Sequence, residues 1–287
     1  MKTLREAIAE MAAQGGAIGH FNIGELSAFE AIAKAVRTTG LPAIIGTSEG
    51  EKEFIGAREA AALVAALRAE GLPVYLNADH HHSLEKIKDA VAAGYDAVLF
   101  DGGKLPLDEN IAQARAVVQF VKAANAQILV EGELGNIGSG SEMRTAVPAE
   151  AQIQLENLTK PEEAARFVKE TGVDLLVPAV GNFHGMVAGG TEKKLNIDRI
   201  REIRAAAGVP LVLHGGSGSR DEDFRAAIKA GIAVVHVSTE LRVALRSGLE
   251  ESFKEMPTEV APFKLFARST EEMAEIVARR MTLFAGR

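Results

Sequence analysis

Seven histidines carry the most distinctive chemistry in this sequence, and they recur in one setting. Each lies in a short apolar run or directly after one, and the full set is His20, His80, His81, His82, His184, His214 and His236. Neutral imidazole is a good Zn²⁺ ligand, and three protein ligands with one open position make a catalytic zinc site. If these runs are strands that end on one face, the sequence predicts a metal centre built from His80, His184 and His214.

Carboxylates accompany these histidines. Asp79 directly precedes His80, Asp101 ends another apolar run, and Glu131 and Glu133 lie two residues apart in a third. Alternation along a strand puts Glu131 and Glu133 on the same face, which we expect to be interior. Buried carboxylates need partners, and a metal ion with histidines would supply them. A polar plug of charge pairs is the alternative for Asp101 and Glu131.

A glycine-rich turn and a pair of hydroxyl residues indicate a phosphate site. They follow the apolar runs that contain the last two histidines, and the set is Gly215, Gly216, Ser217, Ser238 and Thr239. Glycine lets backbone N–H groups approach an anion, and hydroxyl groups add donors. The alternative is an ordinary turn in which Ser217 or Ser219 caps the next helix.

A repeated pattern of helix, glycine and strand positions these residues. An amphipathic stretch ends at a glycine and an apolar run soon follows, at Gly40, Gly71, Gly94, Gly172, Gly208 and Gly231. Glycine ends a helix because it enters the left-handed conformation at little cost. The apolar runs predict eight strands, at 17–23, 42–48, 73–80, 97–103, 127–134, 175–181, 210–216 and 233–239. Strands that alternate with helices favour an α/β fold, a single (β/α)8 TIM barrel forming one domain over 1–287, above an open doubly wound sheet.

Composition limits the classes of function. The chain has 287 residues, of which 47% are hydrophobic and 25% charged, as is ordinary for a globular enzyme. The net charge of −7 argues against a nucleic-acid partner, and no apolar run approaches the ~20 residues of a membrane span. The chain has no cysteine and no signal peptide, so we expect neither disulfides nor thiolate sites, and we expect a cytoplasmic protein. No predicted strand contains a lysine, which argues against Schiff-base chemistry.

Five motifs, in order along nearly the whole chain, resemble the class II, metal-dependent ketose-bisphosphate aldolases. They are Asp79-His80, Glu131-Gly132-Glu133-Leu134-Gly135, His184-Gly185, His214-Gly215-Gly216-Ser217 and Val237-Ser238-Thr239-Glu240-Leu241. The resemblance implies Zn²⁺, or another divalent metal, on the three histidines predicted above, with Asp101 and Glu133 as ligands at a second metal position. It also implies that Asp79 transfers a proton, and that Glu142, in a mobile loop at 135–145, is a second acid/base group.

The implied reaction is reversible cleavage of fructose 1,6-bisphosphate to dihydroxyacetone phosphate and glyceraldehyde 3-phosphate through a zinc-stabilised enediolate, in glycolysis and gluconeogenesis. The residues implied to hold the dihydroxyacetone-phosphate end are Gly185, Gly215, Gly216, Ser217, Ser238 and Thr239, with His236 beside them. A Na⁺ or K⁺ ion near this phosphate and a homodimer or homotetramer are implied as well. Tagatose 1,6-bisphosphate or another ketose phosphate stays open as substrate, and a zinc-dependent barrel hydrolase and a non-catalytic sugar-phosphate binder are more distant alternatives.

The sequence departs from the family's pattern at two places. His236 stands where the family usually has Asn, which puts in question how the ketose-phosphate end is held. His81 and His82 follow the predicted ligand where a small residue is common. Because consecutive residues point in different directions, we do not expect both to reach the metal: one would lie behind the ligands and the other would face solvent.

Overall fold

Eight parallel strands form a closed barrel in the computed structural model, which describes residues 1–138, 140, 143–144, 157–187 and 194–287. The strands are β1 (Ile18–Asn22), β2 (Ala43–Thr47), β3 (Val74–His81), β4 (Ala97–Phe100), β5 (Leu129–Leu134), β7 (Leu175–Pro178), β9 (Leu211–Leu213) and β10 (Ile232–His236). Each lies within or overlaps one of the eight predicted runs. The prediction of an α/β TIM barrel is therefore confirmed, and the open doubly wound sheet is excluded.

Closure of the barrel brings the first and last strands together. β1 pairs with β2 on one side and with β10 on the other, so that His20 is in register with both Ile44 and His236. Every residue of these three strands is buried. A strand buried on both faces reads as a continuous apolar run, which is why the sequence pattern identified the strands. The same burial makes each histidine within them conspicuous.

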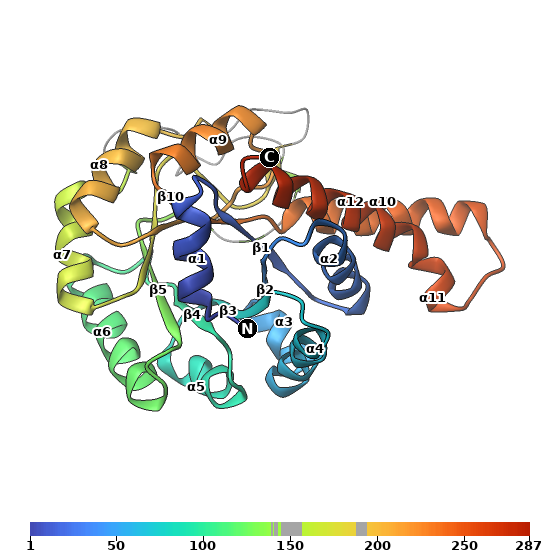
Figure 1. The fold of residues 1–287 in the computed structure, drawn as a ribbon, viewed down its shortest axis with the longest axis horizontal. Helices are drawn as coiled ribbons and strands as arrows, with labels where there is room; N and C mark the ends of the chain where they lie inside the picture. The colour runs from blue at the N-terminus through green and yellow to red at the C-terminus, as the bar shows by residue number, and fades with distance from the viewer. Residues whose placement is uncertain (139, 141–142, 145–156, 188–193) are drawn as a thin grey trace.

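Helices surround the barrel (Figure 1). They are α1 (Leu4–Ala13), α2 (Leu26–Thr39), α3 (Glu49–Ile55), α4 (Ala57–Ala69), α5 (Leu84–Ala93), α6 (Leu107–Ala124), α7 (Pro161–Thr171), α8 (Ile197–Ala207), α9 (Asp221–Ala230), α10 (Thr239–Glu255), α11 (Pro262–Leu265) and α12 (Ala267–Phe284). None of the helices in the described ranges is both long and apolar enough to cross a membrane.

The six glycines that punctuate the sequence behave as expected. All have positive φ, between 66° and 126°. Gly40, Gly94, Gly172 and Gly208 are left-handed caps at the ends of their helices. A residue with a Cβ would be strained at each of these positions, so glycine fixes where each helix stops and the next strand can start.

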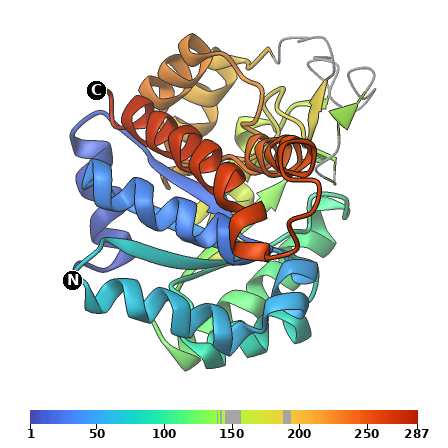
Figure 2. The same ribbon diagram turned by 90° about the vertical axis from the view of Figure 1, so that its right-hand side faces the viewer.

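Two features were not apparent from the sequence. Figure 1 shows α10 and α12 extending beyond the barrel side by side, with α11 at their far end. From there α12 returns to pack beside α2, as Figure 2 shows, and the Ala17 N–H donates to the Phe284 carbonyl at 2.8 Å. A separate two-stranded sheet joins β6 (Met143–Arg144) to β8 (Met186–Val187).

Candidate functional site

An irregularity at the end of β3 presents Asp79 and His80 to the same cavity. The register of β3 on β4 shifts between Ala78 and His81. Within it, His80 has a φ of 45°, the one positive φ of a non-glycine residue in the described part of the chain. Neighbouring strand residues normally point to opposite faces, and a bulge re-aims one of them. The strained backbone therefore lets both side chains line one cavity.

The three histidines predicted as metal ligands converge. One nitrogen of each of His80, His184 and His214 lies within 4.8 Å of the others. His80 Nε2 is 2.9 Å from His214 Nδ1, and the His80 ring meets the other two edge-on, at interplanar angles of 75° and 90°. Rings at these angles can direct their in-plane lone pairs to one point, as tetrahedral zinc requires.

Gly215 allows the strands that carry two of these histidines to close on each other. His184 follows β7 and His214 follows β9. A Cβ on Gly215 would lie 2.3 Å from the Phe183 carbonyl oxygen, and φ at Gly215 is 61°. No other residue fits there without moving the backbone next to His184.

Asp101 and Glu133 lie behind His80 rather than in front of it. Asp101 Oδ2 is 2.9 Å from His80 Nδ1, and Glu133 Oε2 is 3.7 Å from the same nitrogen. Burial by itself would raise the pKa of Asp101, but the hydrogen bond and charge of His80 lower it to about 2. Burial, and then the charge of Asp101, raise the pKa of Glu133 well above its ordinary value. Carboxylates in this position orient a ligand histidine, and with it they form a second group of metal-ligand type.

Three imidazoles form a stack, and two of them, His214 and His236, line the cavity. The rings of His20 and His236 have centroids 3.5 Å apart at 6°, and those of His236 and His214 have centroids 3.7 Å apart at 30°. The lone pairs of stacked rings run side by side, so two stacked histidines cannot both bind one ion along their ring planes. Burial is the main cause that lowers the pKa of all three, which favours neutral rings.

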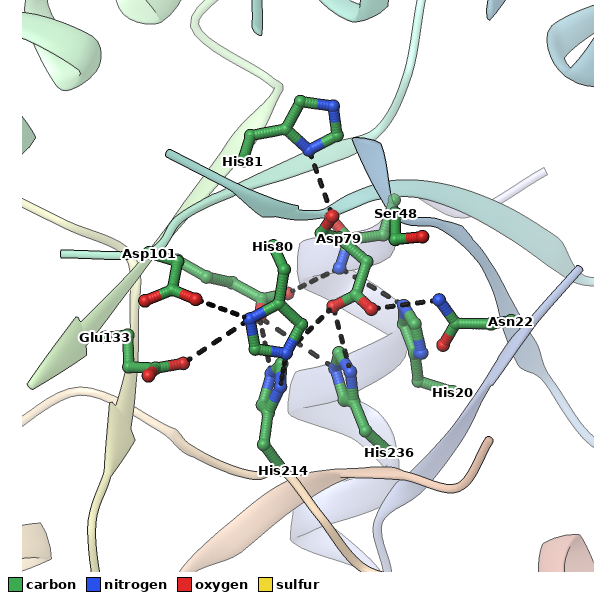
Figure 3. Close-up of polar contacts among 12 residues, drawn as sticks. His20, Asn22, Ser48, Asp79, His80, His81, Asp101, Glu133, His214 and His236 are labelled. Atoms are coloured by element: carbon green, nitrogen blue, oxygen red, sulfur yellow. Dashed lines mark hydrogen bonds and ion pairs between the residues drawn. The ribbon is translucent and has the colours of Figure 1, made fainter. Parts of the chain in front are cut away.

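His236 lies between two carboxylates. Its Nδ1 is 3.4 Å from Asp79 Oδ1, and its Nε2 is 3.9 Å from Glu131 Oε2. Glu131 also approaches His214 Nε2 at 3.7 Å, and burial raises its pKa to about 8. Figure 3 shows His236 and His214 next to each other below Asp79 and His80. His236 thus contacts Asp79, and it lines the same cavity as the residues predicted for the ketose-phosphate end.

The site calls for a cation. Asp79 Oδ1, Glu131 Oε2, Glu133 Oε2 and His214 Nε2 are buried and have no hydrogen-bond partner in the described ranges. Burial would lower the pKa of His80, but carboxylates, Asp79 first, raise it to about 10. A proton on His80 or a divalent ion on the histidines would answer this excess of negative charge. Three convergent imidazoles backed by carboxylates fit Zn²⁺.

The predicted phosphate residues form one wall of the cavity. Its volume is about 180 Å³, and Gly185, Gly215, Ser217, Ser238 and Thr239 line it together with the metal-site histidines. The Ser238 hydroxyl is buried and has no partner among the described residues. Gly216 stands apart from this wall, because it does not line the cavity and its N–H donates to the His236 carbonyl at 3.1 Å.

Ser217 joins two loops instead of capping α9, the helix that follows it in the sequence. Its hydroxyl accepts from the N–H groups of Ser238 at 3.2 Å and Glu240 at 3.4 Å. The N-cap residue of helix α9 is Arg220, so neither Ser217 nor Ser219 occupies the N-cap position. The helix-cap alternative for Ser217 and Ser219 is therefore wrong, and Ser217 connects the turn after β9 to the start of α10.

A polar network next to Asp79 was missed in the sequence. Asn22 Nδ2 donates to Asp79 Oδ2 and to Glu51 Oε2, both at 2.9 Å. Glu51 also accepts from the Ser48 N–H and hydroxyl at 2.8 Å, and from Arg242 Nη2 at 2.5 Å. Asn22 could have been found, since alternation places it with His20 on one face of β1. Glu51 and Arg242 lie on helices α3 and α10, whose approach to the cavity only the fold defines.

The two histidines after His80 separate as expected. His81 is fully buried, and its Nδ1 lies 3.0 Å from the Asp79 carbonyl oxygen; Figure 3 shows its ring turned away from the cluster. Half of the His82 side chain is exposed at the cavity rim, and its Nδ1 lies 3.2 Å from the Asp101 carbonyl oxygen. Glu142, the predicted second acid/base group, lies outside the described residues.

Comparison with known proteins identifies one family over nearly the whole chain. Residues 2–287 match the family described as fructose-bisphosphate aldolase class II. The YdjI aldolase from Escherichia coli K12 is 28% identical, with a TM-score of 0.81 over 98% of this chain and 96% of that one. A Coccidioides immitis protein described as a putative fructose-1,6-bisphosphate aldolase is 27% identical, with a TM-score of 0.83 over 98% of this chain and 95% of that one. The fold alone is shared with the fructose-bisphosphate aldolase of Campylobacter jejuni, at 20% identity and a TM-score of 0.81 over 98% and 93%.

Proposed function

Because the chain belongs to the class II fructose-bisphosphate aldolase family, we propose that it reversibly cleaves fructose 1,6-bisphosphate to dihydroxyacetone phosphate and glyceraldehyde 3-phosphate. The observation that carries this proposal is the convergence, in one cavity, of three histidines of metal-ligand type, an adjacent carboxylate and a wall of hydroxyl groups. Family membership also favours aldol chemistry over the hydrolase alternative.

We propose His80, His184 and His214 as the ligands of a catalytic Zn²⁺, with Asp101 and Glu133 able to hold a second position. When bound there, a divalent ion would polarise the ketose carbonyl and stabilise the negative charge that develops as the carbon–carbon bond breaks. The carboxylates behind His80 would orient its ring and balance the charge. The Na⁺ or K⁺ ion beside the phosphate stays a prediction.

Asp79 is the proposed proton carrier. It accepts the C4 hydroxyl proton as the C3–C4 bond breaks, and it returns that proton when the bond forms. Burial alone would raise its pKa, but the charge of His80 and the contact with His236 hold the pKa well below the ordinary value, which favours the ionised, proton-accepting form. Asn22 fixes one of its oxygens and His236 lies 3.4 Å from the other, which supports a defined orientation. Glu142 stays the predicted second acid/base group, and we assign to it the protonation of C3 that completes the release of dihydroxyacetone phosphate.

Two phosphates require two anion sites. The wall of Ser217, Ser238 and Thr239 is proposed for the dihydroxyacetone-phosphate end. Arg242 supports a second site, because no other Lys or Arg side chain lines the described part of the cavity. Glu51 holds Arg242, and the same carboxylate accepts from Asn22 beside Asp79. Because Asp79 is proposed to act on C4, this network would place the Arg242 guanidinium near the aldehyde half of the substrate, which carries the 6-phosphate.

The test is a coupled assay of triose-phosphate release from fructose 1,6-bisphosphate, as purified, after chelation and after zinc is restored. We expect chelation to abolish cleavage and zinc to restore it. Activity that survives complete removal of metal would overturn the mechanism. Running tagatose 1,6-bisphosphate and fructose 1-phosphate in parallel would settle the epimer and the need for a distal phosphate.

A variant checks the distal site separately. Arg242→Met should raise KM for the bisphosphate about tenfold or more, and much less for fructose 1-phosphate, because a charge-assisted contact contributes about 1.5–3 kcal/mol. Arg246→Met is the matched control, since Arg246 lies one turn further along α10, with 83% of its side chain exposed. Equal losses on both substrates would argue against a phosphate contact at Arg242.

A homodimer or homotetramer is proposed as well. It is supported by exposed apolar side chains, Phe54 on α3 and Val260 and Phe263 near the far end of the α10–α12 pair. Light scattering in solution would give the mass. A role in glycolysis or gluconeogenesis and a cytoplasmic location stay predictions of the sequence.

A further inference from the structure

Arg280 is a buried arginine that does not reach the cavity. It lies on α12, and 7% of its side chain is exposed. Its Nε and Nη2 donate to the two carboxylate oxygens of Glu240 at 3.0 and 2.8 Å, and its Nη1 donates to Asp221 at 2.8 Å. The guanidinium carbon lies 4.9 Å from the centre of the Phe224 ring. All these contacts hold one cation rigidly under the first turn of α10.

Glu240 connects this arginine to the candidate phosphate wall. Its Oε1 accepts from the Gly218 N–H at 3.0 Å, and its own N–H donates to the Ser217 hydroxyl at 3.4 Å. Gly218 follows Ser217 in the sequence, and Glu240 follows Thr239. The Glu240 carboxylate therefore joins positions directly next to the phosphate wall in both loops. It fastens the turn after β9 to the start of α10, and therefore sets the spacing of the hydroxyl groups.

This carboxylate creates an electrostatic problem for a phosphate site. A helix N-terminus favours an anion, but a buried carboxylate beside it opposes one, and little solvent screens the repulsion. Arg280 cancels the charge of Glu240. Asp221, the second carboxylate that Arg280 contacts, has half of its side chain exposed, so solvent screens its charge. A buried ion pair is by itself a weak source of stability, because desolvation of both charges offsets their attraction. A contribution to stability therefore does not explain the buried Arg280–Glu240 pair.

We propose that Arg280 is a positioning residue that cancels the charge of Glu240, so that Glu240 can fasten the two phosphate-binding loops without repelling the phosphate. The inference rests on the proposed function only in taking Ser217, Ser238 and Thr239 as a phosphate wall. It predicts effects of opposite sign for the two partners. Loss of the cation weakens phosphate binding, whereas loss of the carboxylate charge strengthens it.

The test measures binding of inorganic phosphate to the full chain by calorimetry and by the rise in Tm, neither of which needs turnover. We expect Arg280→Met to weaken phosphate binding about tenfold, which is what about 1.4 kcal/mol of uncompensated repulsion gives. Glu240→Gln keeps an oxygen for the Gly218 N–H and should bind phosphate several-fold more tightly than the parent. The double variant should return close to the parent value, and Arg280→Lys should lie between the parent and Arg280→Met.

Arg279→Met is the matched control, because Arg279 is the exposed neighbour on the same helix and its loss changes the net charge equally. A merely structural brace would make both single variants bind more weakly, and that result would overturn the proposal. Phosphate binding by Arg280→Met equal to that of Arg279→Met would overturn it too. If Arg280→Met does not fold, Glu240→Gln still decides, since weaker binding there contradicts charge compensation.

Turnover gives an independent readout. For a ketose bisphosphate, Arg280→Met should raise KM with kcat changed by less than about threefold, and zinc content should match that of the parent. If the parent cleaves no ketose bisphosphate, the proposed function fails while the phosphate measurements still test Arg280. If the parent cleaves it but the two charge variants do not move in opposite directions, only the present inference fails.

Discussion

The ring of His20 occupies the space that a side chain at position 46 would need. A Cβ on Gly46 would lie 2.1 Å from His20 Cε1 and 2.5 Å from its Nε2. The two residues lie on adjacent strands, β1 and β2, inside the barrel. Glycine at 46 is thus the condition for an imidazole at 20, and through it for the histidine stack that ends at His214.

Gly46→Ala should therefore destabilise the protein by about 1–3 kcal/mol, the usual cost of overfilling a packed core. Urea unfolding would measure it. Gly50→Ala is the matched control, since a Cβ there would meet no atom within 4 Å. His20→Ala combined with Gly46→Ala should recover much of the loss, and a double variant as unstable as Gly46→Ala would contradict the steric explanation.

Asp79→Asn should slow cleavage strongly while leaving the metal in place. The amide keeps the shape of the side chain, and its oxygen can still accept the hydrogen bond from Asn22 Nδ2. It cannot act as a base and take up a proton. General acid–base catalysis contributes about 10²–10⁴-fold, so we expect kcat to fall by that factor with zinc per chain unchanged. Zinc content would be measured by atomic absorption on the same samples. If the variant keeps more than a tenth of the parent kcat, Asp79 is not the proton carrier.

Removal of single imidazoles should identify the metal ligands. His80→Ala, His184→Ala and His214→Ala should each lower zinc affinity by about 100-fold or more, because a three-ligand site loses one of its donors. His82→Ala is the control, since that side chain is 57% exposed. Competition with a chromogenic chelator measures the affinity. Zinc binding by His184→Ala as tight as in His82→Ala would exclude His184 from the ligand set.

The buried Tyr95 should make stability depend on alkaline pH. Burial raises the pKa of Tyr95 to about 12, while its hydroxyl shares a hydrogen bond with Thr47 at 2.9 Å. The unfolded chain loses this proton near pH 10, so the native state holds it longer. The contribution is complete below pH 10 and is lost as pH rises from 10 to 12, by about 2 kcal/mol. In Tyr95→Phe, the free energy of unfolding should fall less steeply between pH 10 and 12 than in the parent. The same pH dependence in both proteins would contradict this prediction.

Much of the architecture could be predicted because it depends on local rules. Gly40, Gly94, Gly172 and Gly208 mark helix ends through their own backbone preference, and strands buried on both faces are continuous apolar runs. Once eight strands alternate with helices, closure places their carboxyl ends on one face. The convergence of His80, His184 and His214 follows from that closure, although they are far apart in the sequence.

What could not be predicted depends on geometry that no local pattern encodes. The bulge at His80 is a shift in register between β3 and β4, and the stack of His20 on His236 requires the first and last strands to be neighbours. Arg242, Glu51 and Arg280 lie on helices, where a charged residue is ordinarily a solvated one. Only the packing of those helices distinguishes these side chains from other surface charges.

The pairing of β1 with β10, and of Ala17 with Phe284, has a consequence for how the protein is made. Ribosomes add about 5–20 residues per second, so the first strand waits roughly 10–50 s for its partner. During that interval α2 and the edge of β1 lack the cover that α12 and β10 later provide. Uncovered strand edges recruit other chains, so the nascent protein should depend on chaperones that shield its first third until β10 and α12 emerge.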